Sequence, residues 1–208
     1  MKVYFVRHGQ TEHNVLEISQ NDAVELSDEG QKQAEILAKR FSKIPIDIIF
    51  ASPMQRAKQT AEIINKELKK ETVYSDLLRE WKRPVELEGK RRDDPMVVEV
   101  YNTINLHQDD PKWHYSDDEN FIEFKNRVKK FLDFLTTEVK QENVLVVSHG
   151  GTIKLITLLM AFGDMVTPEI FFGFVDTFMI YNTSITLCEK KEGGRWSVEA
   201  FNDHSHLG

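Results

Sequence analysis

The sequence predicts an α/β fold in three layers, an α/β/α sandwich with a mostly parallel central sheet and an inserted helical or loop lid. Short apolar runs rich in β-branched residues alternate with amphipathic helical patterns, which is typical of a parallel sheet covered by helices on both faces. Distinctive polar residues follow three of these runs directly, and ligands of such folds bind beyond the carboxyl ends of the strands. The length of 208 residues favours one domain over 1–208.

The first strand and helix are predicted before residue 46. Residues 3–6 form an apolar run that ends abruptly in charged and glycine-containing sequence, which indicates a short buried strand. Ser27 predicts a helix N-cap, and apolar residues then recur at helical spacing as far as Phe41. Pro45 ends this helix. We expect its apolar face to cover the sheet.

A second strand followed by a second helix is predicted next. Residues 46–51 form another apolar, β-branched run and predict the second strand. Ser52 and Pro53 then resemble an N-cap followed by proline at the first helical position, so we expect a helix to about Lys69. A short strand is expected near 73–74.

The middle of the chain lacks this regularity. Residues 76–120 carry many charges and several prolines without a clear period, so an inserted lid is predicted at about 81–120. Ser116 and Glu119 match the ends of a capping box and would introduce a long amphipathic helix, whose apolar face continues to Val139.

The last part of the chain predicts one more strand and helix, followed by shorter strands. Residues 144–147 indicate a third buried strand, and an apolar helix is expected over about 152–162. The remaining strands are expected around 178–181, 184–188 and 196–201, with a hairpin turn at 192–194. The apolar run 170–174 is suited either to the core or to the interface of a homodimer.

Composition excludes several classes of protein. A net charge of −7 argues against a nucleic-acid partner, because binding to a phosphate backbone depends on dense lysine and arginine. The single cysteine, Cys188, excludes an internal disulfide and fits a reducing compartment. The residues up to Arg7 contain too short an apolar run for a signal peptide or a membrane span. We therefore expect a cytoplasmic protein with no membrane partner.

Three predicted strands end in residues suited to binding an anion. Arg7 and His8 follow the first strand, Ser52 and Arg56 follow the second, and His149 follows the third. A cation in the first turn of a helix is disfavoured by the helix dipole, so Arg56 indicates a nearby anion.

Phosphate is the anion that this set of residues favours. Gly150, directly after His149, would let a backbone N–H group at a helix start approach it. Arginine binds phosphate oxygens in a bidentate manner. A neutral imidazole can attack phosphorus and divide a slow hydrolysis into two displacements. No metal or other cofactor is required, and His204 and His206 are interpreted as surface residues rather than a metal pair.

Five segments, in order, resemble the signature of the histidine phosphatase superfamily, which includes phosphoglycerate mutases. They are Arg7-His8-Gly9-Gln10-Thr11-Glu12-His13-Asn14, Leu26-Ser27-Asp28-Glu29-Gly30-Gln31-Lys32-Gln33-Ala34, Ser52-Pro53-Met54-Gln55-Arg56-Ala57-Lys58-Gln59-Thr60-Ala61, Leu78-Arg79-Glu80, and Val147-Ser148-His149-Gly150-Gly151. The resemblance covers roughly 1–80 and 140–185.

The resemblance implies a role for each matching residue. His8 would become the phosphohistidine, and Arg7, Arg56 and His149 would form the phosphate pocket. Asn14 would add a hydrogen bond to the phosphoryl group. Glu80 matches the acid that protonates the departing alcohol and later helps water to attack.

The sequence departs from the family pattern directly after Glu80. Glu86 is therefore an alternative candidate for the acid. The leading interpretation is a metal-independent phosphoric monoester hydrolase of histidine acid phosphatase type, acting on a small phosphorylated metabolite. Alternatives are a phosphotransferase of phosphoglycerate mutase type and a non-catalytic protein that binds phosphorylated ligands.

We expect the identity of the substrate to be determined by the lid. Its candidate contact residues could equally be packing residues of the lid. They are Arg83, Arg91, Trp113 and His114.

Overall fold

The fold is described from a computed structural model, which covers residues 1–107 and 110–208. Six strands form one sheet in the order β3-β2-β4-β1-β5-β6. Their bounds are β1 Lys2–Arg7, β2 Ile48–Ala51, β3 Thr72–Tyr74, β4 Asn143–Ser148, β5 Ile185–Lys190 and β6 Trp196–Asp203. β3, β2, β4 and β1 are parallel, whereas β5 and β6 pair in the antiparallel direction. The predicted mostly parallel sheet is confirmed.

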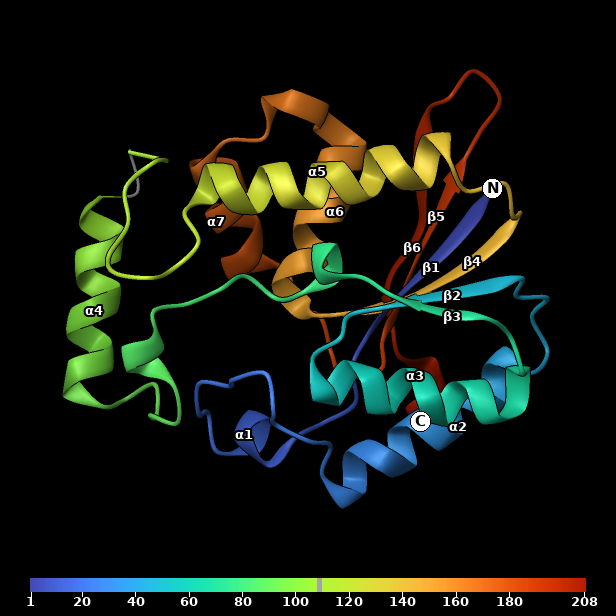
Figure 1. Ribbon diagram of the computed structural model, residues 1–208, viewed down its shortest axis with the longest axis horizontal. Coiled ribbons are helices and arrows are strands. Elements are labelled where there is room, and N and C mark those ends of the chain that lie inside the picture. Colours follow the sequence, from blue (N-terminus) through green and yellow to red (C-terminus); the bar gives the residue numbers. More distant parts are fainter. Residues whose placement is uncertain (108–109) are drawn as a thin grey trace.

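Helices cover both faces of this sheet, as Figure 1 shows. The helices are α1 Glu12–Val15, α2 Asp28–Phe41, α3 Gln55–Leu68, α4 Pro95–Leu106, α5 Phe121–Thr137, α6 Gly150–Phe162 and α7 Pro168–Thr177. α2 and α3 lie below the sheet in this view, and α5, α6 and α7 lie above it. Neighbouring β1 side chains alternate between the two cores, since Phe5 packs with α5 and α6 and Val6 packs with α2 and α3. The predicted three-layer α/β/α sandwich is thereby confirmed.

The strand register brings three strand ends to one edge of the sheet. Arg7 at the end of β1 pairs with Ser148 at the end of β4, and Ala51 at the end of β2 pairs with Val147. The next residue after each strand is therefore delivered to the same edge. This edge carries His8 and His149.

The second helix begins later than the sequence predicts. Ser52 is not its N-cap, because the Ser52 N–H group donates to Val147 O at 2.9 Å and so extends the pairing of β2 with β4. Met54 occupies the N-cap position and α3 starts at Gln55. Arg56 still lies in the first turn, as expected.

The capping box of the long helix also lies elsewhere. Asn120 caps α5, because its side chain accepts a hydrogen bond from Glu123 N at 2.9 Å and the Glu123 side chain accepts from Asn120 N. Glu119 cannot complete the box predicted with Ser116, since its carboxylate is paired with Arg127 at 2.7 Å. The prediction of a capping box was correct in kind and wrong in position.

The strand predicted at 178–181 is absent; these residues instead follow the end of α7 without regular structure. Backbone groups of this stretch form hydrogen bonds with side chains instead of with a neighbouring strand. Arg7 Nη1 donates to Ile180 O, and Tyr181 N donates to Asn202 Oδ1. The apolar run 170–174 belongs to α7, where Phe171 is buried in the core and Ile170 is exposed.

The 81–120 segment contains α4 and has a small apolar cluster of its own. Leu87, Val97 and Val100 are buried together there. α4 lies at the left edge of Figure 1, apart from the helices that cover the sheet. An isolated bridge between Ile18 and Arg91 joins the segment to the loop after α1. Residues 108–109 of this predicted lid lie outside the described residues.

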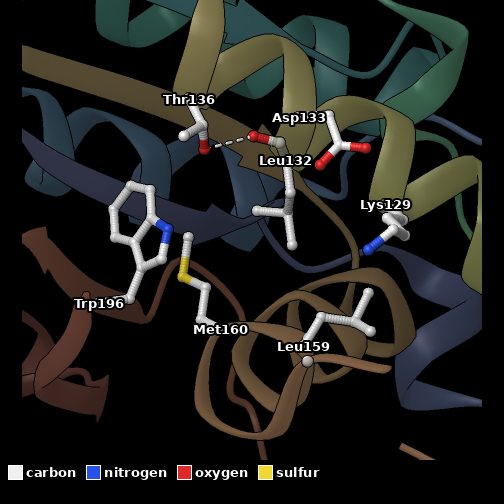
Figure 2. Close-up of a pocket in the computed structure, with 8 residues that line it drawn as sticks. Lys129, Leu132, Asp133, Thr136, Leu159, Met160 and Trp196 are labelled. Carbon is white, nitrogen blue, oxygen red and sulfur yellow. Dashed lines mark hydrogen bonds between the residues drawn. The ribbon is translucent and has the colours of Figure 1, made fainter. Parts of the chain in front are cut away.

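A cavity of about 140 Å³ lies between α5, α6 and β6. Figure 2 shows Leu132, Leu159, Met160 and Trp196 around it, together with polar side chains of α5. It is lined by none of the residues predicted for the phosphate site. Among the described residues, no helix has both the length and the apolar character needed to cross a membrane.

Candidate active site

His8 is held from both sides of its ring. Arg56 Nε lies 3.2 Å from His8 Nε2, and because arginine nitrogens only donate, Nε2 must accept. The Nδ1 atom, 2.7 Å from Gly9 O, then carries the proton and donates it to that carbonyl. Burial lowers the pKa of His8 well below 6.5, and the charges of Arg56 and Arg7 lower it further. His8 is therefore a neutral imidazole whose Nε2 lone pair faces Arg56.

The two arginines supply buried positive charge beside His8. Arg56 is buried on α3, and its Nη1 donates to Asn21 O at 2.9 Å. Burial lowers the pKa of Arg56 to about 10, so the guanidinium remains charged at neutral pH. Arg7 Nη1 donates to Ile180 O at 2.5 Å. The site therefore holds two cations.

His149 faces His8 from the start of α6. Their ring centroids lie 5.2 Å apart, and His149 Nε2 is 2.8 Å from Ser52 Oγ. Burial lowers the pKa of His149 well below 6.5, with Arg56 as the next largest cause. Ser52, predicted as a helix cap, thus orients His149 instead.

Two buried polar atoms at this site lack a hydrogen-bond partner within the described part of the chain, namely Arg7 Nε and His149 Nδ1. Buried polar groups are almost always paired, and an unpaired one costs about 1–3 kcal/mol. A bound oxyanion would give Arg7 Nε its acceptor. The site is therefore built for a ligand that accepts hydrogen bonds.

Glu80 is fixed over the first turn of α6. Gly151 N donates to its Oε2 at 3.0 Å, and Thr152 N donates to its Oε1 at 3.1 Å. A Cβ at residue 151 would lie 2.6 Å from Glu80 Oε1, so a side chain here would force the carboxylate to move. A Cβ at Gly150 would have its nearest contact at 3.8 Å, with Arg7 Nε. Gly150 therefore lies against the Arg7 side chain, at ordinary van der Waals distance.

Glu86 lies apart from these residues. Its Oε2 accepts a hydrogen bond from Ser116 at 2.9 Å on the exposed side of the 81–120 segment. Glu80 acts electrostatically on both Arg7 and Arg56, whereas Glu86 acts on neither. The geometry brings Glu80 to the arginines and leaves Glu86 outside.

Asn14 is oriented by a residue that the sequence did not single out. Asn14 Oδ1 accepts from Thr11 N at 3.1 Å and from Asn182 Nδ2 at 3.2 Å. Its amide nitrogen is thereby left to donate elsewhere. Asn182 also donates to His8 O at 3.0 Å. It follows the predicted strand 178–181 and belongs to none of the recognised motifs, so no local signal marked it.

Two further cations lie near the arginines, and neither was among the predicted site residues. Lys154 is buried on α6, where its Nζ donates to Val175 O at 2.9 Å. Burial lowers the pKa of Lys154, and the charges of Arg7 and Arg92 lower it further. The Arg92 side chain makes no hydrogen bond or ion pair with a described residue. A lysine inside an apolar helix was the available sequence signal.

The four lid candidates make contacts within the protein. Arg83 stacks on Trp81 with its guanidinium carbon 4.1 Å from the ring centroid, and Arg91 is paired with Asp93 at 2.9 Å. The remaining contacts are the stacking of Trp113 on His107 at 4.2 Å and a hydrogen bond between His114 and Asp118 O at 2.8 Å. Each of the four therefore has a partner within the protein, which favours a structural role.

The described residues include no group of three or more His, Cys, Asp or Glu side chains placed to hold a metal ion. His204 Nδ1 bonds to Asn202 O at 2.9 Å, and His206 Nδ1 lies 3.3 Å from Arg40 Nη1. These two histidines therefore have protein partners.

Comparison with known proteins gives consistent relatives. A Schizosaccharomyces pombe protein named "probable phosphatase" is 35% identical over 213 residues, covering 100% of this chain and 95% of the relative. A broad-specificity phosphatase of Saccharomyces cerevisiae is 27% identical, covering 100% and 88%. A solved mutant of phosphoserine phosphatase from Entamoeba histolytica, in complex with phosphoserine, is 26% identical with a TM-score of 0.80, covering 99% and 98%. That phosphatase is also solved with 3-phosphoglyceric acid.

The model of the histidine phosphatase superfamily (branch 1) matches residues 3–204. It therefore spans the five ordered motifs and every residue of the site described above. This chain belongs to the histidine phosphatase superfamily.

Proposed function

We propose that this protein is a phosphatase that hydrolyses phosphate monoesters through a phosphohistidine on His8. The observation that carries the proposal is the neutral His8 ring, whose Nε2 lone pair faces Arg56 Nε at 3.2 Å. A phosphoryl group bound between the arginines would meet this nitrogen. The unpaired Arg7 Nε and the Asn14 amide nitrogen supply further donors for its oxygens.

In the first step, His8 Nε2 attacks phosphorus while the bond from phosphorus to the ester oxygen breaks. Glu80, in its protonated form, gives its proton to the departing oxygen, and the alcohol leaves. Arg7 and Arg56 neutralise the charge on the phosphoryl oxygens while the phosphoryl group moves from the ester oxygen to His8 Nε2. His149 completes the pocket.

In the second step, water attacks the phosphorus of the phosphohistidine. The Glu80 carboxylate accepts a proton from that water, and the bond from phosphorus to Nε2 breaks. Inorganic phosphate leaves, and His8 returns to its neutral form. We propose that both steps proceed without a metal, because arginine side chains supply the positive charge that a metal would otherwise provide.

We further propose that the substrate is a small phosphorylated compound carrying a second anionic group, such as a carboxylate. Arg92 lies close enough to Arg7 and Lys154 for its charge to lower the pKa of both. An anionic group on the substrate would relieve this repulsion. The Entamoeba histolytica phosphatase is solved with phosphoserine and with 3-phosphoglyceric acid, and both of these compounds carry a carboxylate.

The test is turnover of phosphoserine, 3-phosphoglycerate and p-nitrophenyl phosphate, with and without EDTA, combined with trapping of an acid-labile phosphoenzyme. We expect hydrolysis that is insensitive to EDTA and is abolished in His8→Asn. The exposed histidine variant His204→Asn is the matched control and should retain wild-type turnover. Wild-type turnover in His8→Asn would overturn the proposal.

The same experiment separates the alternatives. A phosphoenzyme that persists in water and transfers its phosphoryl group to phosphoglycerate would indicate a mutase. Thermal stabilisation by phosphorylated ligands, without turnover of any ester, would indicate a binding protein.

A further inference from the structure

We propose that Thr60 is a positioning residue that sets the tautomer and the direction of His8. Thr60 lies on α3, one turn after Arg56, and its hydroxyl is fully buried. Its hydroxyl makes hydrogen bonds with Gly9 and Arg56, and none with the His8 ring. The inference rests on the proposed phosphoryl transfer to His8.

Four hydrogen bonds form a closed ring through Thr60. Arg56 Nε donates to His8 Nε2 at 3.2 Å, and His8 Nδ1 donates to Gly9 O at 2.7 Å. Gly9 N donates to Thr60 Oγ1 at 3.0 Å, and that hydroxyl donates to Arg56 O at 2.7 Å. Thr60 therefore connects Gly9, which accepts the hydrogen bond from His8 Nδ1, to Arg56, which donates to His8 Nε2.

This closed set of hydrogen bonds fixes the orientation of the Thr60 hydroxyl. Its single proton is used by Arg56 O, so its oxygen must accept from Gly9. Many helical threonines donate to the carbonyl four residues earlier, as Thr157 does to Ile153 O at 2.8 Å. Only the acceptance from Gly9 N turns this ordinary helical contact into support for the nucleophile.

Gly9 is confined on its other side by α2. A Cβ at Gly9 would lie 2.5 Å from Gly30 O, so the two backbones are in close contact. Between Gly30 and Thr60, the Gly9 backbone has one orientation, with its carbonyl turned to His8 Nδ1. The proton of the His8 ring therefore stays on Nδ1, and Nε2 keeps the lone pair that the proposed reaction uses.

Removing the hydroxyl while keeping the shape of the side chain tests this role. In Thr60→Val, Gly9 N loses its acceptor and the Gly9 backbone is free to reorient. We expect kcat to fall about 10- to 100-fold, as for other groups that orient a functional histidine from behind. KM should change little, because Arg7, Arg56 and His149 still bind the phosphoryl group. Thr60→Ser retains the hydroxyl and should restore kcat.

Two further measurements make the experiment decisive. Thr157→Val removes a buried hydroxyl with the same helical contact and should leave kcat unchanged. Nitrogen-15 spectra of the histidine side chains, with His8 assigned by its loss in His8→Asn, should show the Nδ1–H tautomer in wild type and Thr60→Ser. Thr60→Val should show a mixture of tautomers.

The spectra also separate this inference from the proposed function, because they need no turnover. If Thr60→Val keeps both the wild-type tautomer and the wild-type kcat, the role of Thr60 is overturned. If the tautomer shifts in Thr60→Val while wild type hydrolyses no phosphate ester, the positioning role stands and the proposed phosphatase activity fails.

Discussion

Arg56 Nε donates a hydrogen bond to His8 Nε2 at 3.2 Å. The contact places a fixed positive charge beside an imidazole that must remain neutral to act as the proposed nucleophile. The contact favours the neutral form of His8 in two ways. The charge of Arg56 opposes protonation of the ring, and its N–H group occupies the Nε2 lone pair that a substrate would have to reach.

Replacing Arg56 should alter both the rate and its dependence on pH. In Arg56→Met, kcat/KM is expected to fall about 100- to 1000-fold, since a donor to the transferring group is lost. The pKa of His8 should rise, because one of the charges that lower it is removed, so the acidic limb of kcat/KM should move to higher pH. Arg195→Met, which removes a charge from an exposed hairpin, is the control. An unmoved acidic limb would contradict the role given to Arg56.

Stability should decrease below pH 6.5 because of His8 and His149. Both have folded-state pKa values well below the usual 6.5, so between these values the unfolded chain binds more protons than the folded chain. Their contribution is therefore fully present above pH 6.5 and is lost as pH falls. Each histidine should add a slope of about 1.4 kcal/mol per pH unit to the free energy of unfolding. Urea unfolding measures this slope, and an identical slope in His8→Asn would contradict the prediction.

A side chain at residue 151 should displace Glu80. In Gly151→Ala the new Cβ would lie 2.6 Å from Glu80 Oε1, and relief of this overlap is expected to cost about 1–3 kcal/mol of stability as well as activity. Gly173→Ala is the matched control, because a Cβ at this position of α7 meets no atom within 4 Å. Thermal unfolding and turnover test both variants. Equal behaviour of the two would show that the carboxylate accommodates the methyl group.

The acid can be identified from the leaving group. Glu80→Gln should slow hydrolysis of phosphoserine about 100- to 10,000-fold, because its alkoxide needs a proton. The same variant should form its phosphoenzyme from p-nitrophenyl phosphate with a much smaller loss, since p-nitrophenolate leaves without one. Burst kinetics separate that step from hydrolysis of the phosphoenzyme. Glu86→Gln should resemble wild type, and the opposite pattern would assign the acid to Glu86.

Arg92 and Lys154 should favour substrates that carry a carboxylate over those that lack one. Phosphoserine carries one and phosphoethanolamine does not. Arg92→Gln and Lys154→Met are expected to reduce kcat/KM for phosphoserine by about 10-fold or more, with a smaller effect on phosphoethanolamine. Arg91→Gln, whose arginine is paired with Asp93, is the neighbouring control. An equal loss of kcat/KM for the two substrates would contradict the proposed contact with the carboxylate.

The residues at the sheet edge could be predicted because their placement depends on local patterns. His8 and His149 each follow a short apolar run, and the carboxyl ends of parallel strands meet at one edge. The periodicity of α2 and α5 is likewise a local property, so their buried faces matched the sequence.

The helix starts were less predictable because capping groups compete with long-range contacts. Ser52 has the chemistry of an N-cap but pairs with Val147 and bonds to His149 instead. Glu119 has the chemistry of a capping box but is paired with Arg127. Neither partner is near in the sequence.

By itself, the sequence determined the alternation of strands and helices and the residues delivered to one edge of the sheet, because both follow from short-range periodicity and strand order. Only the tertiary structure decided that Glu80 rather than Glu86 reaches α6, that Asn182 supports Asn14, and that Thr60 joins His8 to Arg56. These relationships join residues from separate segments of the chain, and the hydrogen bonds that create them exist only once the segments pack together.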